Sequence, residues 1–344
     1  MVLEFQAQRD PSDELCREIA AHAPGNPFFT GEYIRAKQLA GLRPYALVLR
    51  DNGRIVAACP AFERSRFLLR SLEIESLPAL TSSDTVFWDE LRRFCRAAGI
   101  SELEVHSAAS KDVVIPPLTG EIWRRTRSEF VIELRGRDLW KELRATHRQR
   151  VNRSRKNDVA LRVAQGNQAW QEHAAAVSAS MQRRRSRGEH VAEIHRSAFF
   201  EALLLNGRAE LFQAAIDDRV LSSALVISAD KGAYYFWAGT REEGMALGAS
   251  HFLIHSISVR LQEQGLDTFN LGGTDLANKG LVEFKRGFGT TEIPLESAGC
   301  RLGSQVKRAV GRSVALLKDD PTRLVRMVMD RVAPRPAVAP APED

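Results

Sequence analysis

The sequence lacks any apolar run near the ~18 residues that a membrane-spanning helix needs. Its first residues, MVLEFQAQRDPSDEL, contain neither the basic segment nor the apolar segment of a secretory signal peptide. Only four cysteines are present, and none lies in a CxxC pair or at metal-ligand spacing: Cys16, Cys59, Cys95 and Cys300. No HExxH motif and no Ser/His/Asp order stands out. We therefore expect a cytoplasmic protein with reduced thiols, and we predict no bound metal.

The chain has 344 residues, which is enough for two domains, and its net charge of +6 is unevenly spread. Residues 135–162 contain ten Lys or Arg against three Asp or Glu, and residues 301–332 contain eight against three. Such basic segments indicate an anionic partner: the phosphates of a cofactor or sugar nucleotide, tRNA, or a lipid surface. Solvated helix faces are the alternative interpretation.

The same order of predicted elements occurs in two parts of the chain. The first part is predicted to contain a helix up to residue 40, strands over 45–50 and 54–62, a helix over 86–98 and a strand over 102–106. The second part is predicted to contain a helix over 197–205, strands over 209–216, 220–229 and 233–238, a helix over 250–264 and a strand over 268–271. Three pairs of chain-breaking residues are each 166 residues apart: Gly41 and Gly207, Asn52 and Asp218, Gly99 and Gly265. This agreement predicts two related α/β lobes.

Outside this repeat, helical signals open the chain, and a basic helix is predicted over residues 138–157 between the two parts. A strand over 161–163, a helix over 168–181 and a basic loop over 183–187 follow it. From 301 to 317, apolar residues recur at helical spacing between basic ones, which predicts an amphipathic helix.

A segment of small residues, REEGMALGA from Arg241 to Ala249, follows the aromatic strand and precedes the helix that begins near Ser250. Free backbone N–H groups and the positive end of the helix dipole gather at such a helix start. A pyrophosphate is the ligand that they hold most readily. A plain strand–helix connection is the alternative.

The stretch from Phe269 to Gly289, FNLGGTDLANKGLVEFKRGFG, is predicted to form a buried strand, a polar loop and a short amphipathic helix. Glycine where a strand leaves a sheet lets another group come close to the backbone, and Lys285 supplies a positive charge. We predict a site for an anionic or acyl-bearing small molecule here. An ordinary strand, loop and helix with a solvated lysine is the alternative.

The pattern Arg-x-x-Gly-x-Ala at Arg241, Gly244 and Ala246 resembles the CoA pyrophosphate loop of the GNAT acyltransferase superfamily. The duplicated lobes, the HRQRVNRSRK helix and the NLGG…GLVEFKRGFG ending resemble its FemAB-like or BioF2-like branch. The resemblance covers most of residues 24–295. It implies an α+β (α/β layered) fold with two tandem GNAT-like lobes, each a mixed, mostly antiparallel sheet flanked by helices, plus C-terminal basic helices.

The resemblance also implies site residues and acyl-CoA, in particular acetyl-CoA, as cosubstrate. The cofactor would contact Trp237, Arg241, Gly244, Ala246, Gly248 and Ala249, with the loop centred on either Gly244 or Gly248. The catalytic residues would be Lys285, Asp275 and Phe284. The substrate would contact His147, Arg148, Arg150 and Gly273, although the basic helix that carries the first three could simply face solvent. In sites of this kind a splayed strand, here Tyr235 to Ala238, positions the thioester.

Acyl transfer needs a deprotonated nucleophile and a stabilised oxyanion. The candidate general bases are Asp275, Glu283 and His251. Asp275 has the best placement, beyond the Gly-Gly pair, although a turn-forming role is the alternative for it. Many similar proteins carry Asp where this chain has Asn270, so a carboxylate role at that position is lost.

The predicted domains are a divergent N-terminal lobe over 1–120, a C-terminal lobe with cofactor loop and active site over 121–298, a basic helical tail over 299–332 and a disordered Pro/Ala-rich end over 333–344. The tail would either dock on the anionic inner face of the membrane or pack on the second lobe.

The favoured hypothesis is an acyltransferase that moves an acyl group, in the first instance acetyl, from acyl-CoA to an amine or hydroxyl of a cell-envelope or exopolysaccharide sugar precursor. The acceptor would be an anionic sugar nucleotide or a lipid-linked saccharide, and DNA is not expected as a partner. An aminoacyl-tRNA-dependent transferase acting on a peptidoglycan precursor ranks lower, because no long coiled-coil arm is evident. A non-catalytic binding protein of the same fold is the third hypothesis.

Overall fold

The computed structural model describes residues 3–66, 69–78, 85–110, 114–188, 198–205 and 208–302. The predicted basic tail and the Pro/Ala-rich end therefore lie outside the described residues, except for 299–302. Residues 299–301 belong to the last β-strand, so the helical tail does not begin at residue 299 as the sequence suggested. The buried Gly299 and Cys300 pair with neighbouring strands there, which the sequence pattern did not reveal.

The described strands form one continuous twelve-stranded sheet, in the order β1-β2-β3-β4-β5-β12-β6-β11-β10-β9-β8-β7. They are β1 (Leu3–Arg9), β2 (Arg43–Asp51), β3 (Arg54–Arg66), β4 (Leu69–Ile74), β5 (Glu102–His106), β6 (Glu121–Glu133), β7 (Ala160–Ala164), β8 (Ala209–Ile216), β9 (Arg219–Ser228), β10 (Gly232–Thr240), β11 (Thr268–Thr274) and β12 (Thr291–Arg301). β4 with β5 and β10 with β11 are parallel, and the other neighbouring strands of the described sheet are antiparallel. The mixed, mostly antiparallel sheet that the sequence predicted is confirmed.

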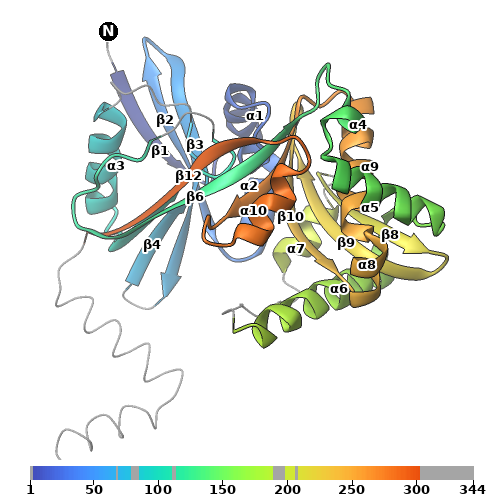
Figure 1. Cartoon of the computed structure of the whole chain (residues 1–344). Coiled ribbons are helices and arrows are strands. Elements are labelled where there is room, and N and C mark those ends of the chain that lie inside the picture. The colour runs from blue at the N-terminus through green and yellow to red at the C-terminus, as the bar shows by residue number, and fades with distance from the viewer. Residues whose placement is uncertain are drawn as a thin grey trace, which may run out of the picture.

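Helices cover both faces of this sheet (Figure 1). In the described residues they are α1 (Asp13–His22), η1 (Pro27–Phe29), α2 (Gly31–Leu39), α3 (Thr85–Ala97), α4 (Leu139–Glu142), α5 (Ala145–Lys156), α6 (Gly166–Ser186), α7 (Ala198–Leu205), α8 (Glu242–Leu247), α9 (Ala249–Glu263) and α10 (Lys279–Arg286). None of these helices is both long and apolar enough to cross a membrane.

The sheet consists of two similar lobes, and each lobe pairs with a strand that follows the other lobe in the chain. The first lobe consists of β1 to β5 and the second of β7 to β11, and β2 and β8 begin 166 residues apart. β6, which follows the first lobe in the chain, pairs with β11 of the second lobe. β12, which follows the second lobe, pairs with β5 of the first. Because β6 and β12 also pair with each other, they join the lobes through the middle of the molecule (Figure 1).

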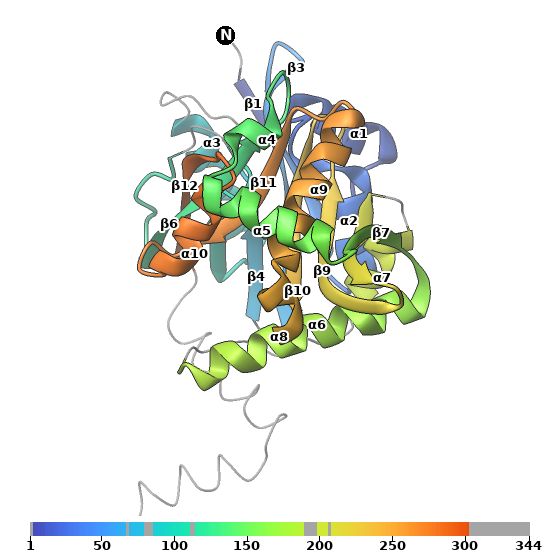
Figure 2. The same ribbon diagram turned by 45° about the vertical axis from the view of Figure 1, so that its right-hand side comes forward.

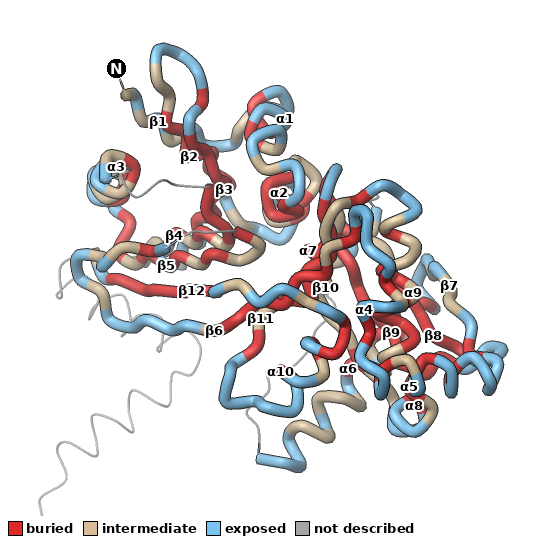
Figure 3. Tube along the Cα trace, turned by 45° about the horizontal axis from the view of Figure 1, so that its top comes forward, coloured by how far each residue is buried: buried red, intermediate tan, exposed pale blue. Residues whose placement is uncertain are grey.

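The buried apolar residues form two cores. One consists mainly of α1, α2, α3 and β2 to β5, and it also takes in residues of α6, α7 and β10. The other lies under α4, α5 and α9. Figure 3 shows the central strands buried, whereas the first half of β6 is exposed. The predicted hairpin turn at Asn52-Gly53 is confirmed, since both residues have positive φ, at 48° and 83°.

The sequence patterns did not predict four of the strands. These are β1, which precedes the predicted opening helix, and β4, β6 and β12. β1 (LEFQAQR) is an edge strand in which every second residue is more exposed, and its ladder with β2 decides its conformation. β6 and β12 carry many charged residues, and their pairing partners are far away in the sequence. β4 is a short strand that pairs with the preceding β3 and with β5. The basic helix is divided into α4 and α5, and the predicted basic loop over 183–187 is mostly the end of α6.

Candidate active site

The parallel strands β10 and β11 form a fork. Their described pairs are Gly232 with Thr268, Ala233 with Phe269 and Tyr234 with Asn270. A bulge between Tyr235 and Trp237 coincides with the point where β10 leaves β11. From Tyr235 to Ala238 the edge of β10 that faces β11 pairs with none of the described strands, and these residues are half-buried. An extended ligand binds to such a free strand edge through main-chain hydrogen bonds.

The equivalent strands of the first lobe, β4 and β5, do not open. Beyond their ladder, the Ala108 N–H donates to the Glu75 carbonyl at 3.1 Å. The Ser110 hydroxyl then accepts from the Leu77 N–H at 3.0 Å and donates to the Leu77 carbonyl at 2.8 Å. These bonds close the first fork, so of the two forks only the one in the second lobe offers an edge to a ligand.

Glu129 of β6 is completely buried at the open fork, where the two lobes meet. One carboxylate oxygen accepts from the Ala109 N–H at 2.9 Å and from Asn270 Nδ2 at 2.8 Å, and the other accepts from the Tyr234 hydroxyl at 2.8 Å. Burial raises the pKa of Glu129, while these hydrogen bonds act against that shift. One carboxylate thus joins the first lobe to both arms of the fork. Sequence reasoning missed Glu129, because an isolated glutamate in a charged strand gives no signal.

Lys285 of α10 is buried next to this carboxylate, with only 7% of its surface exposed. Its Nζ donates to the carbonyls of Gly272 and Gly273, at 2.7 and 3.3 Å, and lies 5.5 Å from the centre of the Phe130 ring. Burial lowers the pKa of Lys285 to about 7, although the nearby Glu129 opposes the shift. The interpretation as a solvated lysine is therefore wrong. A buried amine that titrates near neutral pH at the end of a strand fork is typical of a functional site.

Asn270 is complementary to Glu129. Its Nδ2 donates to the carboxylate, and its Oδ1 accepts from the Gly272 N–H at 2.8 Å. An Asp at this position could not donate and would place a second negative charge beside Glu129. Where many similar proteins have Asp, this chain has Asn270, and the carboxylate comes from Glu129 on β6.

The predicted substrate residue His147 packs inside the protein. It is buried, and its Nε2 lies 2.8 Å from the Phe284 carbonyl. A side chain on Gly287 would overlap with the His147 ring, so the end of α10 fits against α5 only with glycine there. The rings of Phe284 and Phe288 also contact His147. These contacts dock α5 onto α10.

The predicted phosphate loop is mostly helical, because residues 242–247 form α8. A side chain on Gly244 would overlap with the Leu221 carbonyl of β9. Gly248 has φ +79°, and a side chain there would come within 2.7 Å of the Arg150 carbonyl of α5. Both glycines are therefore needed for close packing of α8 and α5, irrespective of any ligand. Figure 2 shows α5 lying across α9.

The other predicted cofactor residues differ in exposure. Ala246 is exposed and Arg241 is half-buried, so both side chains are accessible near the start of α9. Ala249 is buried, which leaves only its backbone N–H for a ligand. Trp237 is half-buried on β10, with its ring 4.9 Å from that of Phe200.

The three candidate bases have other partners. Asp275 is exposed and accepts from the Ala277 N–H at 3.0 Å, as in a turn. Glu283 is exposed and forms an ion pair with Arg144 at 2.8 Å. Burial lowers the pKa of His251 to about 4, with a further contribution from His147, whose ring is 4.6 Å away.

Arg127 of β6 is a further cation near the fork that sequence reasoning missed. It is half-buried, its Nε has no hydrogen-bond partner, and no carboxylate lies within ion-pair distance among the described residues. A side chain on Gly273, a predicted substrate residue, would be 3.8 Å from one Arg127 nitrogen. Arg150 on α5 is exposed, whereas Arg148 is half-buried and donates to the Lys141 carbonyl.

A family model described as an acetyltransferase (GNAT) domain matches residues 141–286. This span includes β10, β11, α8 and Lys285. Residues 141–286 are thus a GNAT acyltransferase domain. The resemblance that the sequence suggested is thereby confirmed. No curated protein sequence matches that of this acyltransferase.

Solved structures show where the same fold occurs. The protein resembles FemX, with a TM-score of 0.61 and 12% identity over 85% of this chain and 96% of that chain. It also resembles L-PGS from Bacillus licheniformis, with a TM-score of 0.57 and 13% identity over 89% and 98%. For the tandem GNAT protein from the clavulanic acid biosynthesis pathway, the TM-score is 0.52 and the identity 13% over 88% and 100%. At such low identity these likenesses show the fold alone, and they confirm the two-lobed architecture.

Proposed function

We propose that this acyltransferase moves an acyl group from acyl-CoA, in the first instance acetyl-CoA, to an amine or hydroxyl of an anionic saccharide precursor of the cell envelope. The observation that carries the proposal is the open fork between β10 and β11, with Lys285 and Glu129 buried at its closed end. The pantetheine arm would pair with the free edge of β10 from Tyr235 to Ala238. Its phosphates would lie near the start of α9, where Ala246 and Arg241 are accessible.

On the acceptor side, Arg127 supports an anionic substrate. A half-buried guanidinium without a carboxylate partner attracts a phosphate or carboxylate group strongly, since protein has already displaced part of its water. Arg127 lies beside Gly273, whose carbonyl accepts from Lys285. An anionic group bound to Arg127 would thus hold the acceptor close to the fork.

For the chemical step, Lys285 in its ammonium form would stabilise the negative charge that develops on the thioester oxygen. The acceptor nitrogen or oxygen attacks the thioester carbon and forms a new bond to the acyl group, and the C–S bond breaks. The proton that the acceptor loses goes to the leaving thiolate, so CoA leaves as the free thiol. Because the pKa of Lys285 is about 7, we expect a falling alkaline limb in the rate near that pH. In Lys285→Arg this limb should disappear, because Arg stays protonated.

Acetyl-CoA titration with matched charge variants tests the donor. Ala246→Glu places a carboxylate on the accessible face of α8, and we expect binding at least about tenfold weaker, because like charges repel. Ala175→Glu, on an exposed position of α6, should bind as the unaltered protein does. Gly244→Glu is unsuitable, because its side chain would disrupt packing against β9. Absence of acetyl-CoA binding, or equal affinity for Ala246→Glu, would overturn the donor assignment.

An aminoacyl-tRNA donor is a second candidate, and the surface of α5 favours it. Arg150, Arg153 and Lys156 are exposed there without a carboxylate partner among the described residues. Such a row of cations binds a phosphate backbone. If ribonuclease abolished transfer, and Arg150→Glu with Arg153→Glu weakened it while Arg54→Glu on the first lobe did not, the donor would be tRNA.

The proposed location is the cytoplasm, where acyl-CoA and sugar nucleotides are made. Contact of the basic tail with the anionic inner membrane surface is part of the proposal. Co-sedimentation of the full chain and of a chain ending at residue 302 with anionic vesicles tests it. Equal sedimentation of both would refute the tail's role.

A further inference from the structure

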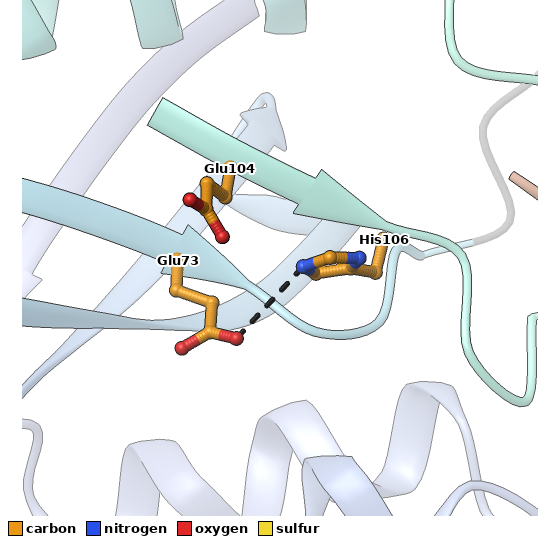
Figure 4. Close-up of side chains that lie close together, drawn as sticks. All are labelled: Glu73, Glu104 and His106. Atoms are coloured by element: carbon orange, nitrogen blue, oxygen red, sulfur yellow. Dashed lines mark ion pairs between the residues drawn. The ribbon is translucent and has the colours of Figure 1, made fainter. Parts of the chain in front are cut away.

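Three potential metal ligands lie together on one face of the first lobe, on the parallel strands β4 and β5. Glu73 and Glu104 are opposite each other in the ladder, and His106 follows Glu104 by two residues, so all three side chains share a face. The ligand atoms that they offer all lie within 4.8 Å of one another. Figure 4 shows Glu73 and His106 facing each other, with Glu104 alongside.

The His106 ring is oriented by a residue outside this group. His106 Nδ1 lies 2.9 Å from the hydroxyl of Ser297, which is buried on β12 next to it in the ladder. Nε2 is left facing Glu73 Oε1, at 3.8 Å. A histidine that binds a metal through one ring nitrogen commonly has the other held by such a partner. Because Nδ1 is held by Ser297, Nε2 is the ring nitrogen that remains for a metal.

The charges around Glu73, Glu104 and His106 favour the binding of a cation. Glu73 and Glu104 bring two carboxylates close together, with oxygens within 4.8 Å of one another. The Lys37 ammonium is already bound to Glu75 at 2.5 Å, although Lys37 and Arg64 act on Glu73 from a distance. The Glu104 carboxylate forms no hydrogen bond or ion pair with another described residue, and it is exposed.

We infer that Glu73, Glu104 and His106 bind one divalent transition-metal ion, Zn²⁺ or Mn²⁺. One imidazole nitrogen and two carboxylate oxygens form a mixed ligand set that suits both ions. Ligand bonds of about 2.0–2.2 Å place neighbouring donor atoms roughly 3–3.5 Å apart, so the group needs only small side-chain rotations to close. The exposed Glu104 leaves the outer side of the ion open to water or to an oxygen-rich ligand. The site lies on the first lobe and stands independently of the acyl donor proposed above.

Metal binding by the full chain, stripped with EDTA and dialysed, tests this inference. We expect Zn²⁺ or Mn²⁺ titration to show one equivalent bound per chain, and the thermal midpoint to rise when the ion is added. Glu104→Gln, an exposed substitution that leaves the core intact, and His106→Gln should each weaken binding at least about tenfold, because each removes one ligand. His22→Gln, at an exposed histidine of α1, should bind as the unaltered protein does.

Two outcomes would overturn the site. The first is no saturable binding of either ion by the unaltered chain. The second is binding that Glu104→Gln and His106→Gln leave unchanged, which would assign the ion to another place. Co²⁺ provides a separate readout, since its visible absorption reports coordination by the protein directly. A Co²⁺ spectrum that is the same in His106→Gln would also refute ligation by His106.

Discussion

At the scale of single residues, Glu129 is the centre of the proposed active site. Its carboxylate accepts three hydrogen bonds in a fully buried position, and it lies close to Lys285. Because three hydrogen bonds occupy its oxygens, the Glu129 carboxylate positions its neighbours more than it reacts. Any change at Glu129 should therefore affect stability and the geometry of the fork together.

The Glu129–Asn270 pair gives the first prediction. Glu129→Gln sets an amide donor against the Asn270 donor, so we expect a loss of about 1–3 kcal/mol in the free energy of unfolding. Asn270→Asp should cost a similar amount, because two carboxylates would meet. The double substitution exchanges donor and acceptor, and we expect it to recover much of the loss in urea denaturation. Strictly additive losses would show that the two side chains do not form the proposed pair.

The second prediction concerns Lys285. Its pKa in the folded protein is about 7, below the ~10.4 of an unfolded chain. Between these values the unfolded chain binds a proton that the folded chain does not. The free energy of unfolding should therefore rise with pH across this window, and the full penalty for Lys285 is present below about pH 7. Urea denaturation at several pH values measures this rise.

Two methionine variants isolate the contribution of Lys285 to this rise. Lys285→Met should lose it, whereas Lys279→Met, on an exposed position of the same helix, should keep it. An equal rise in Lys285→Met and in the unaltered protein would contradict the burial of a titrating amine.

At the scale of elements, α10 positions Lys285 by packing against α5. The His147 ring fills the space beside Gly287, and its Nε2 is within hydrogen-bonding distance of the Phe284 carbonyl. The buried side of the basic helix thus supports the active site, while its exposed arginines, Arg150, Arg153 and Arg155, face outward. This explains why Phe284 and Lys285 occur together in the sequence with glycines after them.

Two glycines of this segment give the third prediction. Gly287→Ala would overlap with the His147 ring, and we expect a loss of about 1–3 kcal/mol in stability, with weaker catalysis through displaced Lys285. Gly280→Ala lies on the same helix with no atom within 4 Å, so it should be neutral or stabilise by about 0.5–1 kcal/mol. Urea denaturation of both variants provides the comparison. Equal stability of the two would show that α5 does not pack tightly on α10.

At the scale of the whole molecule, the exchanged strands make the two lobes one structural unit. β12 lies between β5 and β6, and β6 lies between β12 and β11. Each lobe therefore completes its sheet with a strand from the other half of the chain. Only the second lobe has an open fork, so the first lobe contributes Ala109 to Glu129 and supports the site rather than repeating it.

Cooperative unfolding is the fourth prediction. Because the sheet is continuous, hydrogen exchange in β2 and β3 should be lost at the same denaturant concentration as in β8 and β9. A chain of residues 1–120 lacks β6 and β12, so it should show no cooperative thermal transition. A folded 1–120 fragment with a native-like melting curve would show that the lobes are independent domains.

The sequence by itself determined the elements whose signals are local. The hairpin at Asn52-Gly53, strand Glu102–His106, the helices that end near Gly41, Gly99 and Gly265, and the duplicated order of elements depend on turn residues and short-range patterns. It also indicated Lys285, because a glycine pair and a lysine follow a buried strand. These features need no knowledge of what packs against them.

The tertiary structure alone decided the rest. β6 and β12 are charged strands whose conformation depends on ladders with partners far away in the chain, and Glu129 and Arg127 became visible only when β6 was placed beside the fork. It also gave His147 and Gly244 roles in packing, since their neighbours come from other helices and strands. The pKa of Lys285 follows from its burial, and burial is a property of the folded whole.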